Sequence, residues 1–270
     1  MNDEHLRVWR LMNNRNAVFG YRGLVFKFYS GSNSDLDKYD CLHLILPSDV
    51  TSSIFEIFLS RINNDSDVII ITREGMPLSL FNDIHMLMLA DALKSLHQAI
   101  TPDKIPSILE NKMLSNGKYD PIIIWREFYL PALNAVGCNS KTVAEKIFEK
   151  LTLVIDNVRS PCLIHGDLHY GNVVVLDEKV KIFDWSNARI DTPLIDLASF
   201  VISAKLSLKR TKAFLSRYDP DINIEDLYIP MFFSILWTAL YMKDNKIYSE
   251  GALHWCKQLS IFNALTVFFA

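Results

Sequence analysis

The spacing of apolar residues along the chain changes near residue 75. Before that point, residues 16–29 (NAVFGYRGLVFKFY) form two β-rich runs separated by a short Tyr-Arg-Gly turn, which predicts an antiparallel hairpin. Residues 30–47 begin with turn and cap residues, then place apolar side chains three or four residues apart and stop at Pro47. This second pattern predicts a helix after the hairpin.

Two further apolar runs complete the N-terminal part. Residues 54–62 (IFEIFLSRI) indicate a strand or a short helix, and residues 66–75 (SDVIIITREG) indicate a strand that ends at a glycine. The Met-Pro pair after Gly75 is typical of a connection between structural units. We therefore predict a first lobe over residues 1–74, built on a small antiparallel sheet and one helix.

The second lobe, residues 75–270, carries mainly helical spacing. Apolar residues recur at three- and four-residue intervals in segments 80–100, 121–137 and 140–159. Two short β-rich runs, VVVL and VKIFDW, then flank an Asp-Glu turn within residues 173–185, which predicts a second hairpin. The predicted fold class is α+β, with a sheet-based N-lobe and a larger, mainly helical C-lobe.

Composition narrows the class of protein. The chain has 270 residues, of which 50% are hydrophobic, and its net charge is -3. It can therefore bury a sizeable core, and nothing electrostatic favours nucleic acid or an anionic membrane as a partner. Its apolar runs are shorter than the roughly 18 residues of a membrane span, and its four cysteines contain no Cys-x-x-Cys pair. A cytoplasmic protein is the prediction.

The densest group of polar residues lies within residues 163–185, LIHGDLHYGNVVVLDEKVKIFDW. Asp167 and Asn172 lie five residues apart across a turn that contains Gly171, so both side chains can face one small volume. Asp184 stands at the far end of the predicted hairpin, and a hairpin returns that end toward its beginning. Asn172 and Asp184 are then placed to hold Mg²⁺, which prefers hard oxygen ligands.

A carboxylate beside such a metal can accept the proton of an incoming hydroxyl while the metal offsets charge on the phosphates. This predicts phosphoryl transfer with Asp167 as the proton acceptor. Protein kinases use the same Asp-to-Asn spacing followed by a metal-binding Asp, although the later motif here is Phe-Asp-Trp. Lys27, on the second strand of the first hairpin, is predicted to contact the phosphates; alone it would equally suit a solvated edge strand.

These motifs together resemble the aminoglycoside phosphotransferase and choline kinase superfamily, which has a two-lobed protein-kinase-like fold. The resemblance rests on LIHGDLHYGNVVV, IFDWSNA and DTPLIDLASF, in the family's order and spacing. It implies that Asp167 is catalytic, with His165 in the same loop, and that Asn172 and Asp184 bind magnesium. It also implies that Asp196 supports the catalytic loop.

The resemblance extends more loosely over the N-lobe. NNRNAVF is similar to a phosphate loop ending at Asn16, and IIITREGMPL to a hinge whose backbone would hold adenine at Ile71, Thr72 and Arg73. The family places a glutamate on the following helix to pair with the lysine, and Asp40 is the candidate here. The family's Gly-Asp-Pro reads Asp-Thr-Pro at residues 191–193, which predicts one carboxylate fewer near the site.

We therefore predict a small-molecule kinase that uses Mg²⁺ and ATP or GTP. An antibiotic or amino-sugar is the first predicted acceptor, with choline, ethanolamine, thiamine or a sugar as the alternative. The near balance of acids and bases beyond residue 90 weakens the case for a polycationic antibiotic.

Other classes remain as alternatives. The phosphate loop lacks a glycine-rich run, which favours a catalytically silent nucleotide-binding or interaction module. Protein phosphorylation is disfavoured because no recognisable activation loop follows Asp184. A zinc hydrolase is disfavoured because HGDLH lies in a turn and lacks a third nitrogen ligand.

Overall fold

The structure is a computed structural model of the chain. It describes residues 6–12, 16–30, 34–47, 58–62, 67–73, 75–78, 82–99, 107–109, 114–115, 118–126, 130–131, 142, 145, 148–149, 161–227 and 230–231. Most of the two helices predicted over residues 121–159 lies outside these ranges, and α4 (Pro121–Ile124) is the described start of the first of them. The lobe boundary near Glu74 stays a prediction.

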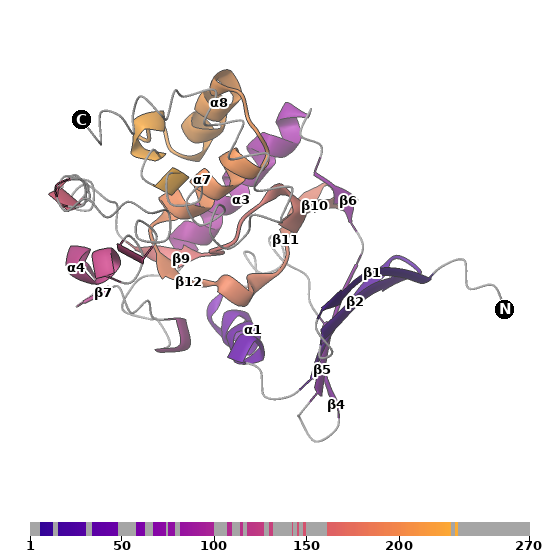
Figure 1. The fold of residues 1–270 in the computed structure, drawn as a ribbon. Coiled ribbons are helices and arrows are strands. Elements are labelled where there is room, and N and C mark those ends of the chain that lie inside the picture. Colours follow the sequence, from indigo (N-terminus) through magenta and orange to yellow (C-terminus); the bar gives the residue numbers. More distant parts are fainter. Residues whose placement is uncertain are drawn as a thin grey trace.

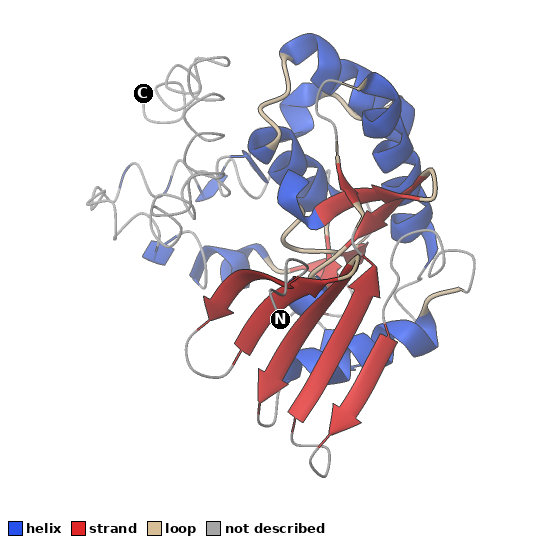
Figure 2. Cartoon of the chain, turned by 90° about the vertical axis from the view of Figure 1, so that its right-hand side faces the viewer, coloured by secondary structure: helices blue, strands red, loops and turns tan. Residues whose placement is uncertain are grey.

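The N-terminal part is a five-stranded antiparallel sheet in the order β1-β2-β3-β5-β4, shown as one continuous layer in Figure 2. Its strands are β1 (Leu6–Met12), β2 (Asn16–Tyr21), β3 (Leu24–Ser30), β4 (Phe58–Ile62) and β5 (Asp67–Arg73). The predicted hairpin is confirmed: β2 and β3 join through Arg22 and Gly23, both at positive φ, as tight hairpin turns require. Strand β1 was not predicted.

Helix α1 (Ser34–Ile45) follows β3, as the sequence predicted. Its apolar spacing puts Tyr39, Leu42 and Leu46, just past its end, into the core, whereas Leu44 is 86% exposed. Figure 1 shows α1 at the side of the sheet that faces the C-terminal part of the chain. Through Lys38 and Tyr39 the helix also contacts residues 185 and 186 of the C-terminal part.

The C-terminal part is mainly helical with short strand pairs. Its longer elements are α3 (Asp83–Ala99), β9 (Cys162–Ile164), β10 (Val173–Leu176), β11 (Lys179–Ile182), β12 (Arg189–Asp191), α7 (Pro193–Ser203) and α8 (Leu208–Tyr218). The predicted second hairpin is confirmed as β10 and β11, with Asp177 and Glu178 at positive φ in the turn. Strand β6 (Met76–Pro77) pairs with β10 and joins the hairpin to the connection after the sheet.

The shorter elements are β7 (Leu114–Ser115), β8 (Lys118–Tyr119) and the 3₁₀ turns η2 (Ser107–Leu109), η4 (Tyr170–Asn172), η5 (Trp185–Asn187) and η6 (Ile224–Leu227). Turns η4 and η5 matter most here, because they stand at the two ends of the β10–β11 hairpin.

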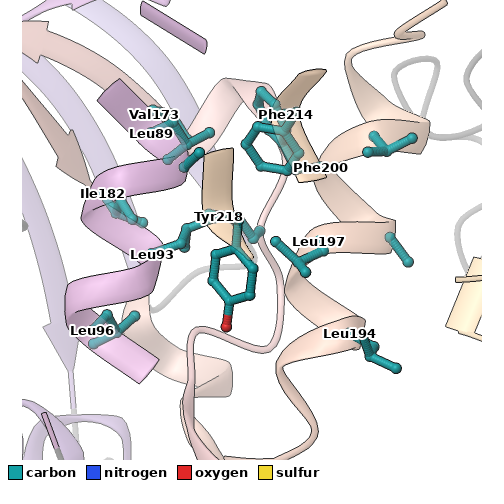
Figure 3. Close-up of a cluster of buried hydrophobic side chains, with 14 of the residues drawn as sticks. Leu89, Leu93, Leu96, Val173, Ile182, Leu194, Leu197, Phe200, Phe214 and Tyr218 are labelled. Atoms are coloured by element: carbon teal, nitrogen blue, oxygen red, sulfur yellow. The ribbon is translucent and has the colours of Figure 1, made fainter. Parts of the chain in front are cut away.

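The core of this part lies where α3, α7 and α8 pack together. Figure 3 shows Leu89 and Leu93 of α3 facing Leu197 of α7, with Phe214 and Tyr218 of α8 between them. Each of these side chains is at most 6% exposed, and burying one contributes roughly 1.5–3 kcal/mol. In the part of the chain that is described, no helix is both long and apolar enough to cross a bilayer.

Candidate active site

The loop between β9 and β10 carries Asp167 and Asn172. Strand β9 pairs antiparallel with β12, which anchors the start of the loop, and η4 ends it. The Asn172 side chain is buried, and its Nδ2 donates to the Asp167 carbonyl oxygen at 3.0 Å. Because the amide nitrogen faces that carbonyl, the amide oxygen points away from it.

The hairpin brings Asp184 back beside Asn172, as the sequence predicted. Phe183 N donates to the Asn172 carbonyl oxygen at 2.8 Å, so the residues before and after the hairpin are bonded directly. Asp184 Oδ1 accepts from Lys27 Nζ at 2.6 Å and from Ser186 Oγ at 3.2 Å. The structure thus places Lys27, Asn172, Asp184 and the loop of Asp167 in one small region.

Lys27 favours the ionised form of Asp184. Burial by itself raises the pKa of this carboxyl, but the charge of Lys27 and its hydrogen bond outweigh burial, so the net pKa lies below the ordinary value. The Lys27 side chain is only 19% exposed, because β3 is an inner strand of the sheet. A cation and a carboxylate held together at the junction of sheet and hairpin suit a site that binds charged phosphates.

His165 joins the two arms of the site through its ring. The Asp167 amide donates to His165 Nδ1 at 3.3 Å, so the ring proton lies on Nε2, which donates to the Phe183 carbonyl oxygen at 2.7 Å. The imidazole is fully buried and packs edge-to-face on Trp185, with ring centroids 4.9 Å apart. These contacts hold the backbone before Asp167 and before Asp184.

Asp196, near the start of α7, forms hydrogen bonds to the backbone of the same loop. Its Oδ2 accepts from the His165 amide at 2.7 Å, and its Oδ1 accepts from the Gly166 amide at 2.9 Å. His97 of α3 also reaches Oδ2, at 3.3 Å. Burial by itself raises the pKa of Asp196, but its interactions with His97 and His165 outweigh burial and lower it. The carboxylate is therefore ionised and clamps the residues before Asp167.

Gly166 leaves no room for a side chain. Its φ is +79°, and a Cβ there would lie 2.3 Å from the Asn187 carbonyl oxygen and 2.5 Å from an Arg189 guanidinium nitrogen. Only glycine adopts this conformation at such close approach without strain. The Gly in the His-Gly-Asp motif is thus explained by the contact with the β12 side of the site.

The predicted loss of a carboxylate at Asp-Thr-Pro stays a prediction; the first residue of that run, Asp191, is a buried carboxylate at the end of β12. Asp191 is 1% exposed and accepts from Arg189 Nε at 2.9 Å and from the Thr192 amide at 2.7 Å. Burial and the nearby charge of Asp196 raise its pKa to about 8, and the hydrogen bond from the Thr192 amide offsets this only in part. The Arg189–Asp191 ion pair was not predicted from the sequence. The alternation Arg-Ile-Asp on a short strand, which puts both side chains on one face, could have indicated it.

The predicted nucleotide residues are described only in part. Ile71 and Arg73 lie at the end of β5, where Ile71 pairs with Phe26 of β3, and Arg73 forms a 2.9 Å ion pair with Asp177. Thr72 lies between them, and Asn16 begins β2. Asp40 lies in α1, but the side chains of Asp40, Asn16 and Thr72 fall outside what the structure describes.

Three comparisons with known proteins agree on the class of protein that this chain resembles. A model of the phosphotransferase enzyme family (APH) matches residues 84–223. The protein LicA homolog of Metamycoplasma hominis is 29% identical over 135 residues, which are 48% of this chain and 54% of the relative. The match therefore spans about half the length of that curated relative.

Solved structures are similar over nearly the whole chain. The choline kinase LicA from Streptococcus pneumoniae superposes with a TM-score of 0.64 at 14% identity, covering 94% of this chain and 92% of that one. The ADP-bound aminoglycoside phosphotransferase APH(2'')-Ib gives 0.62 at 15% identity, with 94% of both chains covered. The predicted α+β, protein-kinase-like fold is confirmed.

Proposed function

The chain belongs to the phosphotransferase enzyme family, and we propose that it is a small-molecule kinase acting on a small amino alcohol of the choline or ethanolamine class. The donor in this proposal is ATP or GTP. The observation that supports it most is the 2.6 Å hydrogen bond from Lys27 Nζ to Asp184 Oδ1, beside Asn172 and the Asp167 loop. This is the set of groups that phosphoryl transfer to a hydroxyl requires.

The amino-alcohol acceptor is preferred over an antibiotic because of the relatives. The sequence match is to a LicA homolog, and one similar structure is that of the choline kinase LicA. Another is a choline kinase from Cryptosporidium parvum, with a TM-score of 0.61 at 16% identity. An aminoglycoside is the second candidate, supported by the similarity to APH(2'')-Ib.

In this proposal Asp167 orients the acceptor hydroxyl and accepts its proton, because a carboxylate is the general base that such a transfer needs. His165 acts as a positioning group: its Nδ1 holds the Asp167 amide. Lys27 contacts the phosphates of the nucleotide, having exchanged part of its contact with Asp184 for them. The adenine lies against the backbone of residues 71–73, and the acceptor binds within residues 75–270.

The donor set suits magnesium. Asn172 presents an amide oxygen and Asp184 a carboxylate of lowered pKa, and both are hard oxygen ligands of the kind Mg²⁺ prefers. When bound, the ion would neutralise charge on the β- and γ-phosphates. The chain itself orients the two ligands, through the hydrogen bond from the Phe183 amide to the Asn172 carbonyl oxygen.

Calorimetry and an acceptor screen test the proposal in two steps. Binding of ATP or GTP is measured by titration with Mg²⁺, and each donor is then incubated with choline, ethanolamine, thiamine and aminoglycosides. We expect a product heavier by one phosphoryl group with an amino alcohol. The proposal fails if neither nucleotide binds, and its acceptor is wrong if only an aminoglycoside is phosphorylated. Binding without any product would indicate a silent module.

A further inference from the structure

Helix α1 forms hydrogen bonds to the backbone of the two residues that follow Asp184. The Trp185 amide donates to the Tyr39 hydroxyl oxygen at 3.0 Å, and Lys38 Nζ donates to the Ser186 carbonyl oxygen at 2.7 Å. Tyr39 is 1% exposed, so its hydroxyl meets the amide in the interior. Figure 1 shows α1 against the turn between β11 and β12, where these contacts form.

The residue between the hairpin and these contacts has an unfavourable backbone. Asp184 has φ 64° and ψ 62°, the left-handed conformation, which costs roughly 1–2 kcal/mol for a residue with a side chain. Such a conformation persists only where its surroundings hold it. The chain on both sides of Asp184 must therefore be fixed.

One side of the turn is fixed from within the C-terminal part. The Trp185 indole donates to the Ile182 carbonyl oxygen at 2.8 Å, and its ring packs on His165. Phe183 is held by Asn172 and His165. The Trp185 amide and the Ser186 carbonyl, in contrast, form hydrogen bonds to α1, which lies about 146 residues earlier in the chain.

We propose that Tyr39 and Lys38 are positioning residues for Asp184. They hold the backbone of residues 185 and 186 against α1 and thereby keep the Asp184 carboxylate in its place beside Lys27. The inference rests on the proposed function, because the alignment matters for binding nucleotide together with Mg²⁺. Neither side chain touches the reacting atoms, so both act through the backbone.

Two conservative variants separate this role from packing. Tyr39→Phe keeps the buried ring and removes the hydroxyl, whereas Lys38→Met keeps the stem and removes the ammonium. A buried amide that loses its acceptor destabilises its local arrangement by an amount equivalent to roughly tenfold in an equilibrium constant. We expect Tyr39→Phe to weaken binding of nucleotide with Mg²⁺ about tenfold and to lower kcat, while nucleotide affinity in EDTA and the KM of the acceptor stay unchanged.

A second readout needs neither nucleotide nor turnover. We expect the Trp185 amide to exchange its hydrogen slowly while it donates to Tyr39, because exchange then requires opening of the turn. In ¹⁵N-labelled, nucleotide-free protein we expect Tyr39→Phe to speed exchange of that amide at least about tenfold, with exchange in α3 unchanged. Lys38→Met should produce a smaller increase at the same amide.

Two matched controls complete the experiment. Leu44→Ala alters an 86% exposed side chain of α1, and Lys209→Met removes one exposed lysine of α8; both should match the wild type. The inference is overturned if Tyr39→Phe keeps wild-type Mg²⁺-dependent binding and Trp185 exchange. It is also overturned if binding with Mg²⁺ and in EDTA weaken equally, as a packing role predicts. Failure of the wild type to bind either nucleotide would instead refute the proposed function.

Discussion

Replacing Asp196 by Asn removes one buried charge from beneath the loop between β9 and β10. The carboxylate accepts from the His165 amide and His97 through one oxygen and from the Gly166 amide through the other. An amide group has one oxygen, so its NH₂ group must face at least one of these donors. Each buried donor left without an acceptor costs about 1–3 kcal/mol, and breaking a buried charged contact costs about 3–5 kcal/mol.

We therefore expect Asp196→Asn to lower the free energy of unfolding by about 3–5 kcal/mol, measured by urea denaturation near pH 7. Asp221→Asn, an exposed carboxylate of the same part of the chain, should change it by less than about 0.5 kcal/mol. Turnover should fall as well, because the Gly166 amide directly precedes Asp167. A loss below about 1 kcal/mol would refute the view that the three bonds hold the loop.

The pH dependence of the free energy of unfolding gives a second test of this prediction. The pKa of Asp196 is lowered in the folded protein, so its stabilising contribution is present above the unfolded pKa, about 3.9. The contribution is lost as the pH falls through the folded value. The stability difference between the wild type and Asp196→Asn should therefore shrink in acid. A difference that grows in acid would contradict the assignment of an ionised Asp196.

Further variants test other parts of the site. Gly166→Ala should lower stability by more than about 2 kcal/mol and nearly abolish turnover, because its Cβ meets the Asn187 carbonyl at 2.3 Å. Gly23→Ala, also at positive φ but with nothing within 4 Å, should cost only about 1 kcal/mol and keep turnover; equal losses in urea denaturation would contradict the steric argument. Asp167→Asn should bind nucleotide with wild-type affinity in calorimetry yet lose turnover at least about 100-fold, and full turnover would remove its role as base. Lys27→Met should weaken nucleotide binding without changing the KM of the acceptor.

Sequence patterns predicted the elements whose cause is local. The Tyr-Arg-Gly turn and the Asp-Glu turn specify their hairpins, since residues 22, 23, 177 and 178 adopt the positive φ that such turns need. Helix α1 and its buried face followed from three- and four-residue spacing that stops before Pro47. Strand β1 was missed, because its LRVWRLM pattern mixes charged and apolar residues and its pairing with β2 is a tertiary fact.

The proximity of Asn172 and Asp184 to the Asp167 loop was predictable because the three residues lie within 18 residues of one another around a single hairpin, whose turn closes it. Contacts between distant segments could not be predicted from the sequence pattern. The Lys27 bond to Asp184 spans 157 positions and that of Lys38 to Ser186 spans 148. Whether a lysine or a tyrosine meets a given backbone atom depends on how whole elements pack, and only the tertiary structure decided that.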